Sequence, residues 1–186
     1  MSKSEKEKML AGELYLAGGT ELAADTKRIS EWMDRFNSKH SRSQEEYQQL
    51  LAEGLGRVGA NVHIRPPLYC DYGYNIEIGN NVFINFNTVM LDVVKIVIGD
   101  KTQIGSGVQI LTADHPRDPR QRHKGLEFGR PITIGSNVWI GSAAVILPGV
   151  TIGDSAVIGA GSIVTRDVPA GATAFGNPAR IRRKEY

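Results

Sequence analysis

Residues 134–164 read IGSNVWIGSAAVILPGVTIGDSAVIGAGSIV, with an aliphatic residue at every sixth position. The repeated residues are Ile134, Ile140, Ile146, Ile152, Ile158 and Val164. Because six is an even number, a single extended strand would carry all of them on one face with nothing to pack against. A chain that bends once per hexapeptide closes a coil after three of them and turns these side chains inward. The period therefore predicts a parallel β-helix whose stacked coils share one core.

The same period extends upstream to Val58, with shifts of two residues after Ile76 and after Ile96. Glycine often follows the repeated aliphatic residue, and we expect it to relieve crowding and to permit unusual dihedrals near the bends. The period stops after Ile110, and residues 112–131, TADHPRDPRQRHKGLEFGRP, form a charged interruption. We expect this segment to leave the β-helix as a loop.

The N-terminal part of the chain has a helical pattern instead. Residues 20–39 carry apolar side chains at mostly helical intervals. Ser43 followed by Glu46 is a capping-box sequence, which predicts the start of a second helix. We therefore divide the chain into a helical region over residues 1–57 and a β-helix over residues 58–186, with a C-terminal tail.

The composition is that of a globular protein that works in water. Of the 186 residues, 41% are hydrophobic and 23% charged, and the net charge of +2 is too small to suggest a nucleic-acid partner. No apolar run approaches the roughly 20 residues that span a bilayer. The N-terminal MSKSEKEKML lacks an apolar signal segment, and the single cysteine, Cys70, sits at a repeat position as a small core residue. These features predict a cytoplasmic protein without membrane contact.

Several segments of the chain resemble one enzyme family. The repeats over residues 78–86 and 98–110, together with the GNPAR segment at 176–180, are similar to the hexapeptide-repeat acyltransferases. EKEKMLAGELYLAGGTELAAD at 5–25 and RPPLYCDYGYNIEIG at 65–79 resemble the maltose O-acetyltransferase branch, near the galactoside and nodulation acetyltransferases. The resemblance covers essentially the whole chain. It implies a left-handed β-helix and a homotrimer, with acetyl-CoA bound between neighbouring subunits; the period alone does not determine handedness.

The resemblance also implies a role for the interrupting loop, because the family carries its catalytic histidine there. That histidine corresponds to His115. A neutral imidazole suits the reaction, since an alcohol must lose its proton as it attacks a thioester. Glu127 resembles the glutamate that orients the imidazole, with Asp114 and Asp118 as weaker candidates. We interpret His123, among basic residues, as part of a solvated face.

Polar residues on the wall of the helix are candidates for binding the acceptor. Asn85 stands where other repeats have glycine, and it matches the family's acceptor-site asparagine, which contacts the acceptor or the oxyanion. Asp71 and Asp92 match acceptor-side positions less closely. Ala17 replaces an aspartate found in some galactoside enzymes, which weakens a galactoside assignment.

The resemblance assigns a further set of residues to acetyl-CoA, the co-substrate, and implies no metal. Small side chains suit the pantetheine arm, and arginines suit the phosphates. These candidates are Trp139, Ser142, Ala160, Thr165, Arg166, Arg180 and Arg183. Trp139 could instead pack against a neighbouring subunit, and Arg182 and Lys184 could belong to a solvated tail.

The expected function is transfer of an acetyl group to the 6-hydroxyl of maltose, glucose or a related glucoside. A galactoside, serine or a xenobiotic remains open as the acceptor. A γ-type carbonic anhydrase would use the same helix, but it needs three metal-binding histidines. The four histidines here are His40, His63, His115 and His123, and the first lies in the helical region.

A non-catalytic scaffold or an ice-binding surface is another alternative. Ice binding calls for a flat array of threonines, and the threonines of the repeats do not form one. Those threonines are Thr102, Thr133, Thr151 and Thr165. An inactive scaffold would also have no need for a loop that carries His115.

Overall fold

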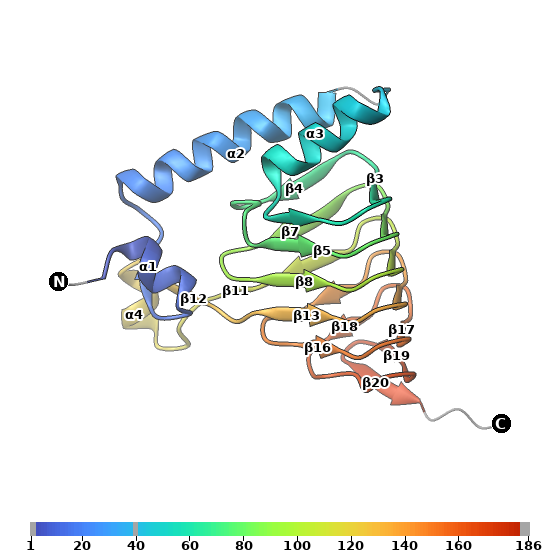
Figure 1. Cartoon of the computed structure of the whole chain (residues 1–186). Coiled ribbons are helices and arrows are strands. Elements are labelled where there is room, and N and C mark those ends of the chain that lie inside the picture. Colours follow the sequence, from blue (N-terminus) through green and yellow to red (C-terminus); the bar gives the residue numbers. More distant parts are fainter. Residues whose placement is uncertain (1–2, 39–40, 183–186) are drawn as a thin grey trace.

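The computed structural model describes residues 3–38 and 41–182. Three sheets form the faces of a stack of coils, with helices across one end and a projecting lobe at the side (Figure 1). The first sheet contains β2 (Arg57–Val58), β5 (Ile76–Ile78), β8 (Ile96–Ile98), β13 (Ile132–Ile134) and β16 (Thr151–Ile152). The second contains β3 (His63–Ile64), β6 (Phe83–Ile84), β9 (Gln103–Ile104), β14 (Trp139–Ile140), β17 (Val157–Ile158), β19 (Thr173–Gly176) and β20 (Ala179–Arg182). The third contains β4 (Leu68–Cys70), β7 (Thr88–Leu91), β10 (Gln109–Leu111), β15 (Val145–Ile146) and β18 (Ile163–Val164).

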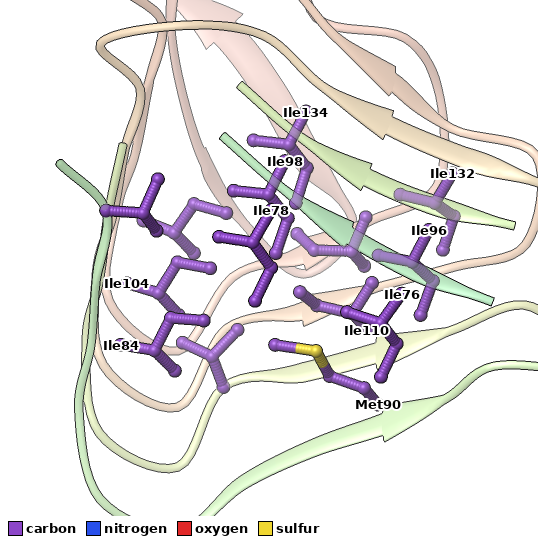
Figure 2. Close-up of a cluster of buried hydrophobic side chains, with 14 of the residues drawn as sticks. Ile76, Ile78, Ile84, Met90, Ile96, Ile98, Ile104, Ile110, Ile132 and Ile134 are labelled. Carbon is purple, nitrogen blue, oxygen red and sulfur yellow. The ribbon is translucent and has the colours of Figure 1, made fainter. Parts of the chain in front are cut away.

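The repeated aliphatic residues form vertical columns inside the stack, as the period predicts. Ile98 pairs with Ile78 on one side and with Ile134 on the other, and all three are buried (Figure 2). The pairing is parallel in all three sheets except at β19 and β20, which form an antiparallel hairpin. Each fully buried isoleucine stabilises the fold by about 1.5–3 kcal/mol relative to an exposed one. The columns are thus the main apolar support of the molecule.

The two shifts in the period have a structural cause. In β5, β8 and β13 the first and third residues both point inward, as Ile76 and Ile78 do. A strand with two inward residues adds two positions to its coil and leaves the alternation of faces unchanged. The first sheet therefore carries two columns of isoleucine (Figure 2).

The glycines after the repeated isoleucines are required by the spacing of the coils. A Cβ atom on Gly79 would lie 2.8 Å from the backbone nitrogen of Asp100 in the next coil. The left-handed dihedrals fall two residues later, on Asn81 (φ 58°) and Lys101 (φ 59°). Relief of crowding is therefore confirmed for these glycines, and in other coils glycine itself takes the left-handed dihedral at that later position, as at Gly107 (φ 69°) and Gly161 (φ 67°).

The described part of the N-terminal region contains three helices, two of which cover the open end of the first coil. They are α1 (Glu5–Leu10), α2 (Thr20–Ser38) and α3 (Gln44–Gly54), and α2 and α3 lie across the end of the stack (Figure 1). Phe36 and Trp32 are buried in the main core, and the Trp32 indole donates a hydrogen bond of 2.7 Å to the carbonyl of Leu50. Ser43 and Glu46 form the predicted capping box. Lys39 and His40 lie outside the described residues.

The charged interruption leaves the coils as predicted. It contains β11 (Ala113–Asp114), the short α4 (Pro119–His123) and β12 (Leu126–Gly129). The chain returns at β13, which pairs with β8 as if the loop were absent. In Figure 1 the loop and α1 form the lobe beside the stack. Within the described ranges, no helix has both the length and the apolar character needed to cross a membrane.

Candidate active site

One edge of the stack gathers the candidate residues for acid–base chemistry. The chain turns there after each strand of the third sheet, and we call this edge the third corner. It comprises residues 71–75, residues 92–95 and the loop 112–131. Because β4, β7 and β10 are neighbours in register, Asp71 and Asp92 follow adjacent strands and the loop follows the next one. The stacking of coils therefore brings together residues distant in sequence.

Asp92 stabilises the turn over residues 71–75 in this corner through hydrogen bonds to its backbone. Its side chain is fully buried, and its Oδ1 atom accepts hydrogen bonds from the backbone nitrogens of Asp71 (3.0 Å) and Tyr72 (2.9 Å). Its Oδ2 atom accepts another from the backbone of Asn75. The structure exposes no part of Asp92 to a ligand. Its predicted role in acceptor binding therefore has to act through the turn that it holds.

Asp71 lies above Asp92 and is half-buried. Burial raises the pKa of Asp71 to about 6, and the negative charge of Glu127 adds to the shift. A carboxylate that raises the pKa of another carboxyl group by its charge must be close to it in space. The third corner thus brings Asp71 of the coil beside Glu127 of the loop.

Glu127 occupies the middle strand of a small antiparallel sheet, in the order β1–β12–β11. The first strand, β1 (Tyr15–Leu16), belongs to the N-terminal region, and Tyr15 pairs with Glu127. On the other side, Asp114 pairs with Phe128 and Ala113 with Gly129. One further step in that register would place His115 opposite Glu127. Residues directly opposite each other project from the same face of a sheet, so Tyr15, Glu127 and His115 share one face in this arrangement.

His115 is exposed and follows the last residue of β11. Its imidazole makes no hydrogen bond to another described residue. Pro116, the next residue, is buried and anchors the backbone beside it. Burial opposes ionisation of Asp114, but hydrogen bonds from the His115 amide, Arg117 and Arg130 outweigh it and lower the pKa of Asp114.

The two rival carboxylates of the loop therefore have other partners. Asp114 binds the arginines, and Asp118 accepts a hydrogen bond of 2.9 Å from the backbone nitrogen of Arg120 at the start of α4. Glu127 has no such partner in the loop, and a continuation of the strand register by one residue would bring it opposite His115. The predicted Glu127–His115 hydrogen bond is not formed, because β11 ends at Asp114 and His115 lies beyond the sheet.

A second group of candidates lies at a different edge. Asn85, Ser142 and Ala160 follow strands of the second sheet, and Trp139 lies on that sheet with 60% of its surface exposed. The Asn85 Oδ1 atom accepts a hydrogen bond of 2.9 Å from the backbone of Phe86. We call this edge the second corner. A strand of the third sheet separates it from the third corner by roughly 13 Å, given a rise of ~3.3 Å per residue.

The remaining candidates lie near the last coil. Arg166 and Arg180 line a cavity of about 160 Å³, beside Ile181. Thr165 is exposed directly before Arg166, and Arg183 lies outside the described residues, as does Lys184. Arg182, for which the sequence left a solvated tail open, belongs to β20 and has its guanidinium over the ring of Phe175.

Three further predictions concern the titratable residues. Cys70 is a core residue, as predicted, and burial raises the pKa of its thiol. His123 is exposed on α4. Across residues 3–38 and 41–182, no three side chains of His, Cys, Asp or Glu gather as metal ligands would.

The sequence did not single out Tyr15 or Tyr72, although both lie beside the acidic pair. Tyr15 is buried in a small second core with Met9, Leu22, Tyr72 and Val93. The only local signal is the aromatic residue between two leucines in Leu14–Leu16, which suggests an extended segment. Its pairing with a strand more than a hundred residues away leaves no trace in a local pattern.

Comparison with known families and proteins identifies relatives along the whole chain. The model described as "Maltose acetyltransferase hexapeptide capping motif" matches residues 8–59, and "Bacterial transferase hexapeptide (six repeats)" matches residues 131–166. Nodulation protein L of Rhizobium meliloti is 58% identical over 98% of this chain and 100% of its own. Galactoside O-acetyltransferase of Escherichia coli is 41% identical over 99% of this chain and 91% of its own.

Solved structures give the same result for the fold. A maltose O-acetyltransferase from Clostridium difficile superimposes with a TM-score of 0.94 at 43% identity, over 98% of this chain and 97% of that one. A galactoside acetyltransferase in complex with coenzyme A also gives 0.94, at 40% identity, over 100% and 92%. The left-handed parallel β-helix is thus confirmed as the fold.

Proposed function

The chain is an acetyltransferase of the maltose and galactoside O-acetyltransferase family, and from this premise we propose that it moves the acetyl group of acetyl-CoA to a sugar hydroxyl. The proposed position is the 6-hydroxyl of maltose, glucose or a related glucoside. Both acceptors that appear in the names of its relatives, maltose and galactoside, are sugars. Ala17 lacks the carboxylate of some galactoside enzymes, which favours a glucoside.

His115 acts as the general base in this proposal. As the acceptor oxygen attacks the thioester carbonyl carbon, the imidazole takes its proton and the carbonyl oxygen becomes an oxyanion. When the C–S bond breaks, the imidazolium returns the proton to the sulfur of coenzyme A. The Glu127 carboxylate fixes the tautomer of the imidazole and stabilises its charged form. The observation that supports this assignment is the register of β11 and β12, whose next step would bring His115 opposite Glu127.

We assign the acceptor to the surface above the third corner. Asp71 offers a half-buried carboxyl group beside Glu127 and can bind a sugar hydroxyl. Asp92 fixes the Asp71 backbone through its own carboxylate. A site built to bind a hydroxyl rejects analogues that lack one, because its buried polar groups are then left unpaired.

The distribution of the candidates supports a site made by two chains. His115 and Asp71 lie at the third corner, whereas Asn85 and Trp139 lie at the second corner across the width of a strand. In a ring of three chains, the third corner of one protomer can meet the second corner of the next. We therefore propose a cytoplasmic homotrimer, in which Asn85 of the adjacent copy contacts the acceptor or the oxyanion.

Acetyl-CoA would lie along the same boundary between chains. Ser142 and Ala160 expose small side chains along the second corner, where an extended pantetheine arm can approach the backbone. Thr165, Arg166, Arg180 and Arg183 would bind the phosphates near the last coil, and the cavity beside Arg166 and Arg180 supports this placement. Relatives have been solved with coenzyme A and with acetyl-CoA. No metal has a part in the proposed reaction.

A panel of acceptors tests the proposal. Release of coenzyme A is measured with glucose, maltose, galactosides, serine and aromatic amines, and NMR locates the acetyl group on the product. We expect the highest kcat/KM with a glucoside or maltose and acetylation at the 6-oxygen. Preference for serine or an amine over every sugar would contradict the acceptor class. No thioester cleavage with any acceptor would contradict catalysis altogether and favour a scaffold.

A further inference from the structure

The hydroxyl of Tyr15 is the one buried side-chain oxygen or nitrogen among the described residues that has no hydrogen-bond partner. The tyrosine is 1% exposed and stands at the centre of the second core. An unpaired buried hydroxyl destabilises the folded state, because it has given up its hydrogen bonds to water. A hydrogen bond that the hydroxyl forms only during the reaction would explain why it is unpaired here.

Three polar groups surround this hydroxyl. Burial raises the pKa of Tyr15, and the negative charge of Glu127 is the largest electrostatic cause, followed by Tyr72 and Asp71. A smaller hydrogen-bonding contribution from Glu127 also raises this pKa, so the two side chains already face each other although their geometry falls short of a full hydrogen bond. A phenol with a raised pKa keeps its proton across the working pH range and can only donate to a carboxylate. Glu127 lies directly across from Tyr15 in the β1–β12 pair, so the two side chains project from the same face of that sheet.

The position of Tyr15 is fixed, whereas the carboxylate of Glu127 is not. The Tyr15 ring is held in the core by residues of α1, α2 and the third corner, namely Met9, Leu22, Tyr72 and Val93. Glu127 is half-buried, and its carboxylate forms no ion pair with another described residue and no hydrogen bond of full geometry, although it already contributes weakly at the Tyr15 hydroxyl. Its strand lies between β1 and β11, so a small rotation of the side chain can direct one oxygen to each neighbour.

We propose that Tyr15 is a positioning residue, whose hydroxyl donates a hydrogen bond to one oxygen of Glu127 while the other oxygen holds the imidazole of His115. This inference rests on the proposed function, because it assumes that His115 is the base. In this proposal the N-terminal region contributes to catalysis through β1, which pairs with β12 of the loop. The same donor orients the carboxyl group of Glu127 toward the imidazolium that forms in the reaction.

The first test follows the Glu127 carboxyl group directly and does not depend on activity. The protein is labelled with ¹³C at the glutamate Cδ, and the signal lost in Glu127→Gln identifies that group. Tyr15→Phe keeps the ring in the core and removes only the donor, so the pKa of Glu127 should rise. Tyr74→Phe is the matched control, because the Tyr74 hydroxyl donates to Asp25 at 3.1 Å instead. An unchanged titration of Glu127 in Tyr15→Phe overturns the proposal.

The second test asks whether Tyr15 acts through Glu127. Tyr15→Phe should lower kcat by about 3–10-fold, less than the full value of a hydrogen bond to a charged group because Tyr15 acts only through Glu127, with the KM for acetyl-CoA unchanged. In a Glu127→Gln background the same substitution should have no further effect on kcat. Equal effects in both backgrounds would show that Tyr15 acts independently of Glu127 and would overturn the proposal.

Thermal stability separates a positioning role from a structural one. Removing an unpaired buried hydroxyl should leave the Tm of Tyr15→Phe unchanged or raise it. A lower Tm together with an unchanged Glu127 titration would identify a structural hydroxyl and overturn the proposal. If the wild-type protein transfers no acetyl group but its Glu127 titration responds to Tyr15→Phe, the contact stands and the proposed function falls.

Discussion

The coils and the third corner differ in how far their residues repeat and in how polar those residues are. In the coils, one residue type is repeated in register, as in the column of Ile78, Ile98 and Ile134, and the side chains inside are apolar. At the third corner, successive coils carry different residues, among them Asp71, Asp92 and the whole loop. Carboxyl groups there are buried, and burial raises the pKa of Asp71. The apolar coils therefore stabilise the fold. Part of this stabilisation offsets the free energy that it costs to remove the carboxyl groups of the third corner from water.

This contrast explains how one architecture can carry a reactive site. Because equal coils stack in register, each corner residue lies next to the corner residues of the neighbouring coils. Polar residues from distant segments of the sequence therefore come together at one corner. The loop and β1 then add an antiparallel sheet that the repeat does not provide. Substitutions in the coils should accordingly affect stability, and substitutions at the corner should affect activity.

The largest effect is expected at the corner. His115→Ala removes the proposed base and should lower kcat by about 10²–10⁴-fold, or about 3–5.5 kcal/mol of barrier. The Tm should stay the same, because the imidazole is exposed and makes no hydrogen bond to another described residue. His123→Ala, in the same loop and equally exposed, is the control and should keep full activity. An unchanged rate in folded His115→Ala would remove this residue from the mechanism.

The next effect belongs to the coils. Ile98→Ala opens a gap between Ile78 and Ile134 and should lower the free energy of unfolding by about 2–5 kcal/mol. Denaturant unfolding measures it, and molecules that remain folded should keep their kcat. Val97→Ala changes the neighbouring, partly exposed side chain of the same strand and should cost far less. Similar losses for both variants would argue against columns as the source of stability.

The smallest expected effect is a dependence of the free energy of unfolding on pH. This dependence should have opposite signs at the third corner and in the coils. The folded pKa of Asp71 is about 6 against 3.8 for the free side chain, so the native state binds more protons between these values. Its stabilising contribution is present below pH ~4 and is lost as the pH rises through 6, by at most about 3 kcal/mol at ~1.4 kcal/mol per pKa unit. Asp71→Asn should remove this loss.

Asp100 on a coil corner provides the comparison. Hydrogen bonds from the backbone and side chain of Asn80 lower the pKa of Asp100, so its contribution is present above its unfolded pKa and is lost on acidification. Tm measured from pH ~2 to ~7 for the wild type, Asp71→Asn and Asp100→Asn checks both signs, because the Asp100 contribution is lost only below its unfolded pKa of 3.8. If both substitutions changed the pH dependence of Tm in the same direction, this result would contradict the account. It would mean that the carboxyl groups of Asp71 and Asp100 do not lie in environments that shift the pKa in opposite directions.

The sequence predicts the coils well because their cause is local and repeated. A six-residue period, with glycine where a Cβ of Gly79 would meet the next coil, leaves few other arrangements. The resemblance adds His115 and Glu127, but the contacts of the corner lie outside any local pattern. The pairing of Tyr15 with Glu127 joins segments that only the folded chain brings together, and the burial of Asp92 depends on three backbone amides that face it.

The central claim is that each active site joins the third corner of one chain to the second corner of another. Its most direct test mixes His115→Ala with Asn85→Ala, two variants that should each be nearly inactive as pure proteins. When the two are unfolded, mixed in equal amounts and refolded, about a quarter of the sites in random trimers should combine an intact His115 with an intact Asn85 from the next chain. We expect recovery of about a quarter of the wild-type activity by the same count. A mixture no more active than the average of the two pure variants would contradict a shared site.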